Sequence, residues 1–406
     1  MKDNRFVNHI KIFLLLLSIF SAFLLGAKVK ANIFTDAGAD IAWPLFFKTN
    51  SGEDREKEQQ EEKRKWEGLF LNNQKSEKYV NVRSGTGVFR LHAFYVNNNS
   101  STTVILQHGY NANSLSLINE AQIFSNQGYN ILLPDARGVG LSGGNFTSFG
   151  AVERDDIREW IKLAKQDSSR IILFGQSMGA STVLLSQESG CNVDAIIEDC
   201  GYTDLRQELK DAVDSVEEIK KIATKIPFLH WDGFKNGIVD SINKKYFIPT
   251  FSVDIDSIKP VNAVRNLNIP KLFIHGTSDT LVPTINEQIF YSNSCTPKKE
   301  YLVNGAKHAD NYRKNPAEYI HQLTDFEIEN GLFHPCIDGK LNIAQSINNE
   351  LNLQNIDCFN NRRLDSEIYE EEVRQLNNLN LSNTGISNLQ GLENASNLNT
   401  LDLSHN

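Results

Sequence analysis

Short apolar runs alternate with amphipathic stretches along the chain from Val88 onward. Apolar runs of this length predict strands, at residues 89–96, 103–107, 130–133, 171–174, 195–198, 271–274 and 301–303. The stretches between them have helical periodicity, at residues 115–126, 152–164, 178–189 and 284–291. Alternation of nearly continuous apolar strands with helices predicts an α/β fold, in which a mostly parallel sheet carries helices on both faces.

Two regions depart from this alternation. Residues 202–260 form a helical, aromatic-containing stretch, and an insertion after a strand at the carboxyl edge of the sheet is expected to lie over the site as a lid. Residues 51–66 are crowded with charged side chains, and opposite charges recur four residues apart, which predicts a solvated helix or a polar linker. We therefore expect a polar extension over residues 32–79 and the α/β domain over residues 80–330.

The strongest local motif is Gly175-Gln176-Ser177-Met178-Gly179, between the predicted strand at 171–174 and a helical stretch. A G-x-S-x-G sequence in that context predicts a nucleophile elbow, a sharp turn that projects the serine hydroxyl from the top of the sheet. The residues two before and two after the serine must lack bulk, and both are glycine. A structural serine in a glycine-rich turn is the alternative interpretation.

A serine hydroxyl needs a base within hydrogen-bond reach, and this fold orders the residues as Ser, acid, His along the chain. Asp279 lies in the loop after the strand at 271–274, and His308 lies in the loop after the strand at 301–303. Both loops leave the carboxyl edge of the sheet, where Ser177 also emerges. The order predicts His308 as the base and Asp279 as the residue that orients it. Asp199, which also follows a strand, is the rival acid, and Asp310 is a weaker one.

An oxyanion intermediate needs two preorganised N–H donors. We expect one from the backbone of Met178, directly after the nucleophile, and the second from Tyr110, in the loop after the strand at 103–107. Gly109 would let the backbone approach the substrate, and the side chain of His108 is expected to be structural.

These motifs together resemble the α/β-hydrolase superfamily, and most closely its Bem46-like and serine-aminopeptidase-like (S33 or S9-like) groups. The resemblance covers roughly residues 80–330 and rests on the motifs HGY at 108–110, DARGVGLSGG at 135–144, GQSMG at 175–179, EDCGY at 198–202 and HGTSD at 275–279, and on His308. It implies hydrolysis of an ester, thioester or amide bond through an acyl-enzyme, and it implies no metal and no organic cofactor. It leaves the substrate, a small-molecule ester or a peptide, open.

The end of the chain has a different periodicity. Leu376, Leu379 and Leu381 recur as Leu398, Leu401 and Leu403, at a constant offset (398 − 376 = 22). A repeat of this length and spacing resembles internalin-like leucine-rich repeats. We expect a linker and repeat cap over residues 331–375, and incomplete repeats over residues 376–406 that could bind a protein partner.

The first 31 residues have the pattern of a secretory signal peptide. Lys2, Arg5 and Lys11 precede an apolar run at residues 12–27, and small residues end at Ala31. The interpretation makes the protein exported, and an uncleaved membrane anchor is the alternative. Export would permit disulfides, and Cys336 and Cys358 are a candidate pair, but unpaired thiols are as consistent with the sequence.

Composition narrows the class of function only a little. The chain has 41 basic and 50 acidic side chains and a net charge of −9, which does not favour nucleic-acid binding. The five cysteines form no CxxC pair, so the sequence does not indicate a zinc site. Two hypotheses follow: an exported serine hydrolase whose repeats tether it, or an interaction protein that uses the repeats and retains the hydrolase domain as a scaffold.

Overall fold

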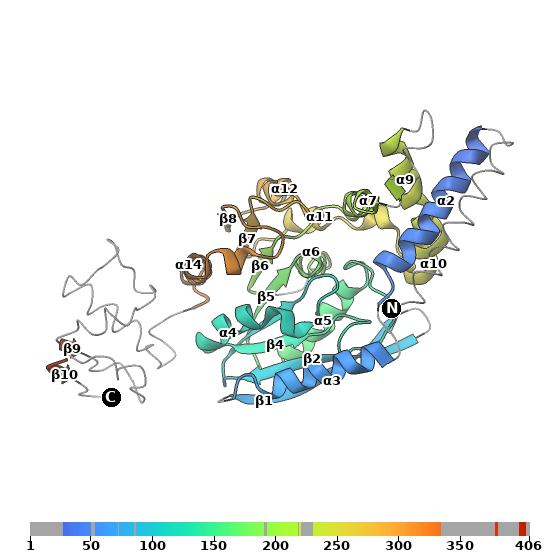
Figure 1. Cartoon of the computed structure of the whole chain (residues 1–406). Helices are drawn as coiled ribbons and strands as arrows, with labels where there is room; N and C mark the ends of the chain where they lie inside the picture. Colours follow the sequence, from blue (N-terminus) through green and yellow to red (C-terminus); the bar gives the residue numbers. More distant parts are fainter. Residues whose placement is uncertain are drawn as a thin grey trace. The chain divides into compact units, whose positions relative to one another are not determined.

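The computed structural model describes residues 27–49, 53–71, 73–84, 87–190, 193–217, 219–220, 230–333, 378–380 and 398–402 (Figure 1). The chain divides into two compact units, Met1–Ala309 and Asp310–Asn406, which are described separately. The larger unit contains the whole central sheet and the candidate site.

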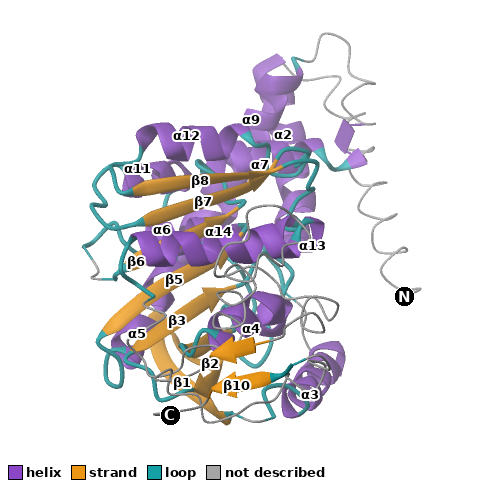
Figure 2. Ribbon diagram, turned by 90° about the vertical axis from the view of Figure 1, so that its left-hand side faces the viewer, coloured by secondary structure: helices purple, strands orange, loops and turns teal. Residues whose placement is uncertain are grey.

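The larger unit is built on an eight-stranded sheet with the order β1-β2-β4-β3-β5-β6-β7-β8. Strands β1 and β2 pair antiparallel, as do β2 and β4, and every pair from β4 and β3 to β7 and β8 is parallel. Figure 2 shows β7 and β8 running side by side. The strands are β1 (Gln74–Ser84), β2 (Gly87–Asn97), β3 (Thr102–Gln107), β4 (Asn130–Pro134), β5 (Arg170–Gln176), β6 (Ala195–Asp199), β7 (Lys271–Gly276) and β8 (Lys298–Val303).

Helices cover both faces of this sheet. On one face, Trp160 from α5 (Glu153–Ala164) and Phe290 from α12 (Ile285–Asn293) join Ile105 and Leu173 of the strands in one buried cluster. On the other face, Phe124 from α4 (Ile118–Asn126) packs edge-on against Phe174. The alternation of side chains along each strand therefore supplies two cores, as the sequence predicts for an α/β sheet. The remaining helices near the sheet are η1 (Ser114–Leu117), α6 (Met178–Leu185) and α11 (Pro260–Val264).

All the predicted strands and helices are confirmed, with small shifts at their ends. Strand β1 was not predicted, and it begins at Gln74, before the expected start of the domain at residue 80. Its sequence, QKSEKYVNVRS, is mostly polar because β1 lies at the edge of the sheet, so that it lacks the apolar run by which the other strands were identified.

Helix α3 (Glu53–Glu67) confirms the helix rather than the linker, and most of it is exposed as expected, but one face is not solvated. One of its faces packs on the α/β domain: Trp66 stacks on Phe94 with ring centroids 4.5 Å apart, and Glu62 is 2% exposed. From the same face, Arg55 and Gln59 donate hydrogen bonds to backbone carbonyls between residues 140 and 144. The four residues of this face, from Arg55 to Trp66, are spaced four, three and four apart, and only Trp66 is apolar. The face therefore has no apolar stripe from which the sequence could predict packing.

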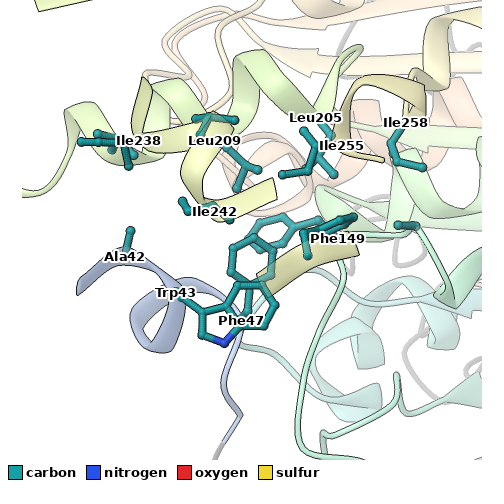
Figure 3. Close-up of a cluster of buried hydrophobic side chains, with 14 of the residues drawn as sticks. Ala42, Trp43, Phe47, Phe149, Leu205, Leu209, Ile238, Ile242, Ile255 and Ile258 are labelled. Atoms are coloured by element: carbon teal, nitrogen blue, oxygen red, sulfur yellow. The ribbon is translucent and has the colours of Figure 1, made fainter. Parts of the chain in front are cut away.

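The segment expected to be a lid is mostly helical in its described part. It contains α7 (Leu205–Asp214), α9 (Trp231–Ile242), the π-helix η2 (Asn243–Phe247), α10 (Ile248–Phe251) and η3 (Ile255–Ser257). Its buried side chains pack with those of α2 (Ala27–Phe46) (Figure 3). We call this the α2–α9 cluster; its buried members include Ala39, Ala42, Trp43, Phe47, Leu205, Leu209, Phe234, Ile238, Ile242 and Phe247. The expectation of a polar extension from residue 32 is therefore wrong for helix α2.

The second unit has described helices α13 (Asn311–Lys314) and α14 (Pro316–Glu329) and two short strands, β9 (Asn378–Asn380) and β10 (Thr400–Asp402). The strands pair in parallel, with Leu401 opposite Leu379, which is the 22-residue offset of the sequence repeat. The rest of the expected repeats, the repeat cap, Cys336 and Cys358 lie outside the described residues, as does the apolar run at residues 12–26. Among the helices of the described ranges, none is long and apolar enough to cross a membrane.

Candidate functional site

Ser177 occupies the turn between β5 and α6 in the conformation expected of a nucleophile elbow. Its φ of 56° and ψ of −122° lie in a region that non-glycine residues rarely adopt. A Cβ on Gly179 would overlap the backbone of Gln107 and His108, and a Cβ on Gly175 would overlap the backbone of Gly179. Both glycines of the motif are therefore required by close backbone approach, and the strain is held in place by the strand and helix on either side.

The structure brings Ser177, His308 and Asp279 together. The Oγ of Ser177 lies 2.8 Å from Nε2 of His308, and the Nδ1 of the same ring lies 2.7 Å from Oδ2 of Asp279. Asp279 follows β7 and His308 follows β8, so all three residues stand at the carboxyl ends of parallel strands. These contacts have the geometry of a Ser-His-Asp triad; the catalytic roles themselves remain predictions.

Asp279 lies in a strongly stabilising environment for a carboxylate. Its Oδ1 accepts hydrogen bonds from the backbone N–H groups of Leu281 and Val282, at 2.9 and 3.0 Å. Burial raises the pKa of Asp279, but hydrogen bonds from His275 and His308 outweigh this effect and bring the pKa to about 2. Asp279 is therefore ionised at neutral pH, as the partner of a catalytic imidazole must be.

Asp199, the rival acid, takes a different position. Its backbone carbonyl accepts a 2.8 Å hydrogen bond from the N–H of Ser177, which ties the elbow to the end of β6. The carboxylate at Nδ1 of His308 is that of Asp279. The geometry thus favours Asp279 over Asp199 as the residue that orients the imidazole.

The expected oxyanion residues lie beside the nucleophile. A Cβ on Gly109 would be 3.2 Å from the Cβ of Ser177, so the backbone leading to Tyr110 passes directly by the elbow. His108 is fully buried; its Nδ1–H donates to its neighbour Gly109, and its Nε2 accepts from Ala136 N–H at 3.0 Å. Burial lowers the pKa of His108, which fits a neutral ring that fixes this loop rather than a base. Met178 follows Ser177 as the first residue of α6.

Two buried residues next to the triad were not identified from the sequence. Nε2 of His275 donates to the carbonyl of Val282 at 2.8 Å and lies 3.4 Å from Oδ2 of Asp279. Burial raises the pKa of Glu198 to about 8, so this carboxyl group is protonated at neutral pH. Nδ1 of His275 and Oε2 of Glu198 have no hydrogen-bond partner among the described residues. The sequence signal was present, since His275 precedes Asp279 by four residues in one strand-and-turn motif.

Cys200 is a third residue near the triad for which the sequence predicts no role. It follows β6 with a φ of 54°, it is fully buried, and its thiol is unpaired. Burial raises the pKa of the thiol, and the charges of Asp199 and Asp279 raise it further. Its sulfur, one carboxylate oxygen of Asp279 and one ring nitrogen of His308 all lie within 4.8 Å of one another.

The α2–α9 cluster reaches the residues that flank the triad. Met178, Val282 and Phe149 are buried members of it, and Tyr110 packs against it. The ring of Tyr110 stacks on Phe149 with centroids 5.0 Å apart, and its hydroxyl donates to the carbonyl of Leu45 in α2. Helix α2 therefore contacts the loop of the expected oxyanion hole as well as α9.

Comparison with known families gives a match over part of the chain. A family model described as "Serine aminopeptidase, S33" matches residues 98–241, which include the strand β3 loop and the Ser177 elbow. The match ends before Asp279 and His308, so it does not bear on those two residues.

Three relatives illustrate the similarity. The chain is 27% identical over 229 residues to the uncharacterized protein YqkD of Bacillus subtilis, covering 55% of this chain and 70% of YqkD. It is 29% identical over 168 residues to the human protein ABHD12B, covering 40% of this chain and 41% of that protein. A solved structure of the Pyrococcus furiosus esterase Pf2001 has a TM-score of 0.49 at 22% identity and covers 64% of this chain and 92% of the esterase. The eight-stranded sheet and the family match together support an α/β-hydrolase fold and a hydrolase-like chain.

Proposed function

We propose that the protein is a serine hydrolase that cleaves an ester, thioester or amide bond through an acyl-enzyme. The observation that carries the proposal is the continuous hydrogen-bond chain from Ser177 through His308 to the ionised Asp279, at a strained elbow. None of the three side chains needs to move to form it, which agrees with a preorganised site.

Each residue has a defined role in this mechanism. Because Nδ1–H of His308 donates to Asp279, Nε2 is the free nitrogen that can take the proton of Ser177 as its oxygen attacks the substrate carbonyl. The backbone N–H groups of Tyr110 and Met178 stabilise the resulting oxyanion, and loss of one such donor costs about 3 kcal/mol of transition-state stabilisation. The imidazolium of His308 then protonates the leaving group, and water attacks the acyl-enzyme with the same base.

An ester with an apolar acyl group is the substrate class that the surroundings favour. The residues that flank the triad, among them Met178, Phe149 and Val282, belong to the apolar α2–α9 cluster. A substrate carbonyl at Ser177 would bring its acyl chain against these side chains, and the segment 202–260 would act as the lid. Graded p-nitrophenyl esters compared with aminoacyl anilides would measure this preference; faster turnover of the anilides would favour a peptidase instead.

A fluorophosphonate probe tests the reaction class directly, because it reacts with an activated serine irrespective of the natural substrate. The wild-type chain should be labelled, and Ser177→Ala should not. Ser292→Ala, at an exposed serine of α12, is the matched control and should be labelled normally. Absence of labelling of the wild type, where a known serine hydrolase reacts, would contradict the proposal.

The alternative function is binding of a protein partner by leucine-rich repeats at the end of the chain. The parallel pairing of β9 with β10 at the offset of the sequence repeat supports repeats of this kind. We compare the full chain with a chain that ends at residue 375. Equal labelling of both by the probe would support a tether added to an enzyme, whereas no labelling of either would support the interaction protein.

Export or membrane anchoring also stays a proposal, based on the N-terminal sequence. Helix α2 begins at Ala27, so cleavage after Ala31 would remove only its first residues. Among the side chains of α2 that the structure describes, from residue 34 onward, the buried ones run from Thr35 to Trp43, and a mature chain that starts at Asn32 keeps them. N-terminal sequencing of the cell-associated and secreted protein distinguishes the two cases, since an intact Met1 in the membrane fraction indicates an anchor.

A further inference from the structure

The candidate site brings together three side chains of types that can bind a metal ion: Cys200, which the hydrolase mechanism does not use, and Asp279 and His308, which it does. The sulfur of Cys200, a carboxylate oxygen of Asp279 and a ring nitrogen of His308 lie within 4.8 Å of one another. A thiolate, an imidazole and a carboxylate are the donor types that Zn²⁺ prefers, and three protein ligands with one open position are a common arrangement around it.

The backbone holds the cysteine in this position. Cys200 adopts a φ of 54° directly after β6, and its N–H donates a 2.9 Å hydrogen bond to the carbonyl of Ile274 in β7. Its thiol is thereby fixed near the loop that carries Asp279. Access to the cluster comes through His308, whose side chain is 17% exposed while that of Asp279 is fully buried.

We propose that Cys200, Asp279 and His308 form an inhibitory site for Zn²⁺ or a similar thiol-seeking divalent cation. Inhibition by the ion rests on the proposed hydrolase function, whereas binding of the ion does not depend on it. Magnesium and calcium, which select oxygen ligands, are not expected to bind.

Binding of the ion would prevent His308 from acting as a base, because it changes which ring nitrogen carries the proton. Nδ1 of His308, the nitrogen next to Asp279, gives its lone pair to the metal, and its proton moves to Nε2. The Cys200 thiol loses its proton to solvent as the metal–sulfur bond forms, and the carboxylate of Asp279 needs no proton change. With Nε2 protonated, His308 can no longer accept the proton of Ser177, so the nucleophile is not activated.

Cobalt is the first probe, because Co²⁺ replaces Zn²⁺ in such sites and a cobalt–thiolate bond absorbs in the near ultraviolet. Titration of the metal-free full chain should give this absorption with an end point at one equivalent, and Zn²⁺ should abolish it. Cys200→Ser and Cys200→Ala should both lack the band, with folding checked by near-ultraviolet circular dichroism. Cys295→Ser, at the other unpaired cysteine of the described ranges, is the matched control and should keep it.

Inhibition is measured next, as activity relative to each variant's own activity without metal. Zn²⁺ should inhibit the wild type and Cys295→Ser reversibly, with recovery on addition of a chelator, and Mg²⁺ should have no effect. Loss of Cys200 should weaken inhibition by more than about 100-fold, because loss of even a supporting partner of a metal ligand costs 10- to 100-fold in affinity.

The two measurements separate the two proposals. A cobalt–thiolate band that depends on Cys200 in a protein without hydrolase activity would support the metal site and contradict the proposed function. A band that persists in both Cys200 variants, or Zn²⁺ inhibition of an active enzyme that is unchanged by them, would overturn the metal site and leave the hydrolase intact.

Discussion

His275 lies beside the carboxylate of Asp279, with its Nε2 3.4 Å from Oδ2. The same oxygen accepts the hydrogen bond from Nδ1 of His308, so the carboxylate is shared between two imidazoles. Burial lowers the pKa of His275, but the interaction with Asp279 outweighs this effect and raises it. We therefore predict that His275 is a positioning residue, which partly offsets the negative charge that Asp279 presents to His308.

We expect His275→Gln to change the pH profile as well as the rate. Loss of a hydrogen bond to a charged group costs about 1.5 kcal/mol, or roughly tenfold in kcat/KM. Because less positive charge then offsets Asp279, the acidic limb of kcat/KM should move to higher pH. His230→Gln, at an exposed histidine, is the control. A lower kcat/KM with an unchanged acidic limb would mean that His275 contributes only to packing.

Asp279→Asn should reduce kcat by about 10⁴-fold, the effect of the equivalent change in a well-studied triad, because the amide favours the wrong imidazole tautomer. The pKa of Asp279 is held at about 2, so this carboxylate does not titrate in the range where the enzyme would be assayed. The acidic limb of the wild-type profile should therefore not report Asp279. Asp199→Asn is the comparison variant. A larger loss of kcat in Asp199→Asn than in Asp279→Asn would identify Asp199 as the acid of the triad.

The parts of the site that could be predicted from sequence are those that a short motif fixes. Gly175 and Gly179 had to be glycine because the backbone of the neighbouring strand and helix occupies the space of a Cβ. The strand-to-loop transitions that carry Asp279 and His308 follow from their apolar runs, since parallel strands all end at one edge of the sheet.

The contributions of α2 and α3 could not be predicted, for two physical reasons. Helix α3 docks through Glu62, Gln59 and Arg55, whose polar groups satisfy backbone and side-chain partners instead of filling an apolar core. Helix α2 packs against α9, about 200 residues away in sequence, and its apolar face predicts burial without naming the partner. Cys200 was missed because a single buried cysteine carries no spacing pattern.

Glu62 predicts a pH dependence of stability. Burial, and then the nearby charge of Asp135, raise the pKa of Glu62 to about 8, while the unfolded chain titrates near 4.3. Between these values the folded state holds a proton that the unfolded state has lost, so the free energy of unfolding falls as pH rises from about 4 to 8.

The variant Glu62→Gln mimics the protonated form and should make this decline with pH less steep. Urea unfolding at pH 5 and pH 8 measures it, with Glu61→Gln, at an exposed neighbour, as control; equal slopes for wild type and Glu62→Gln would contradict the prediction.

Phe47 provides the test of whether the end of α2 is part of the hydrolase domain. Its ring is fully buried and packs edge-on against both Phe149, next to the candidate site, and Phe247 of η2. Replacing a buried phenylalanine by alanine costs about 3 to 5 kcal/mol, so Phe47→Ala should lower the free energy of unfolding by that amount. Leu45→Ala, at a side chain that is 51% exposed, should change the free energy of unfolding little.

If the α2–α9 cluster also contacts the acyl group of the substrate, Phe47→Ala should lose more activity on long-chain p-nitrophenyl esters than on p-nitrophenyl acetate. A variant with unchanged stability would mean that residues 34–47 are not packed on the α2–α9 cluster in solution, whereas a destabilised variant with unchanged chain-length preference would assign the cluster to folding alone.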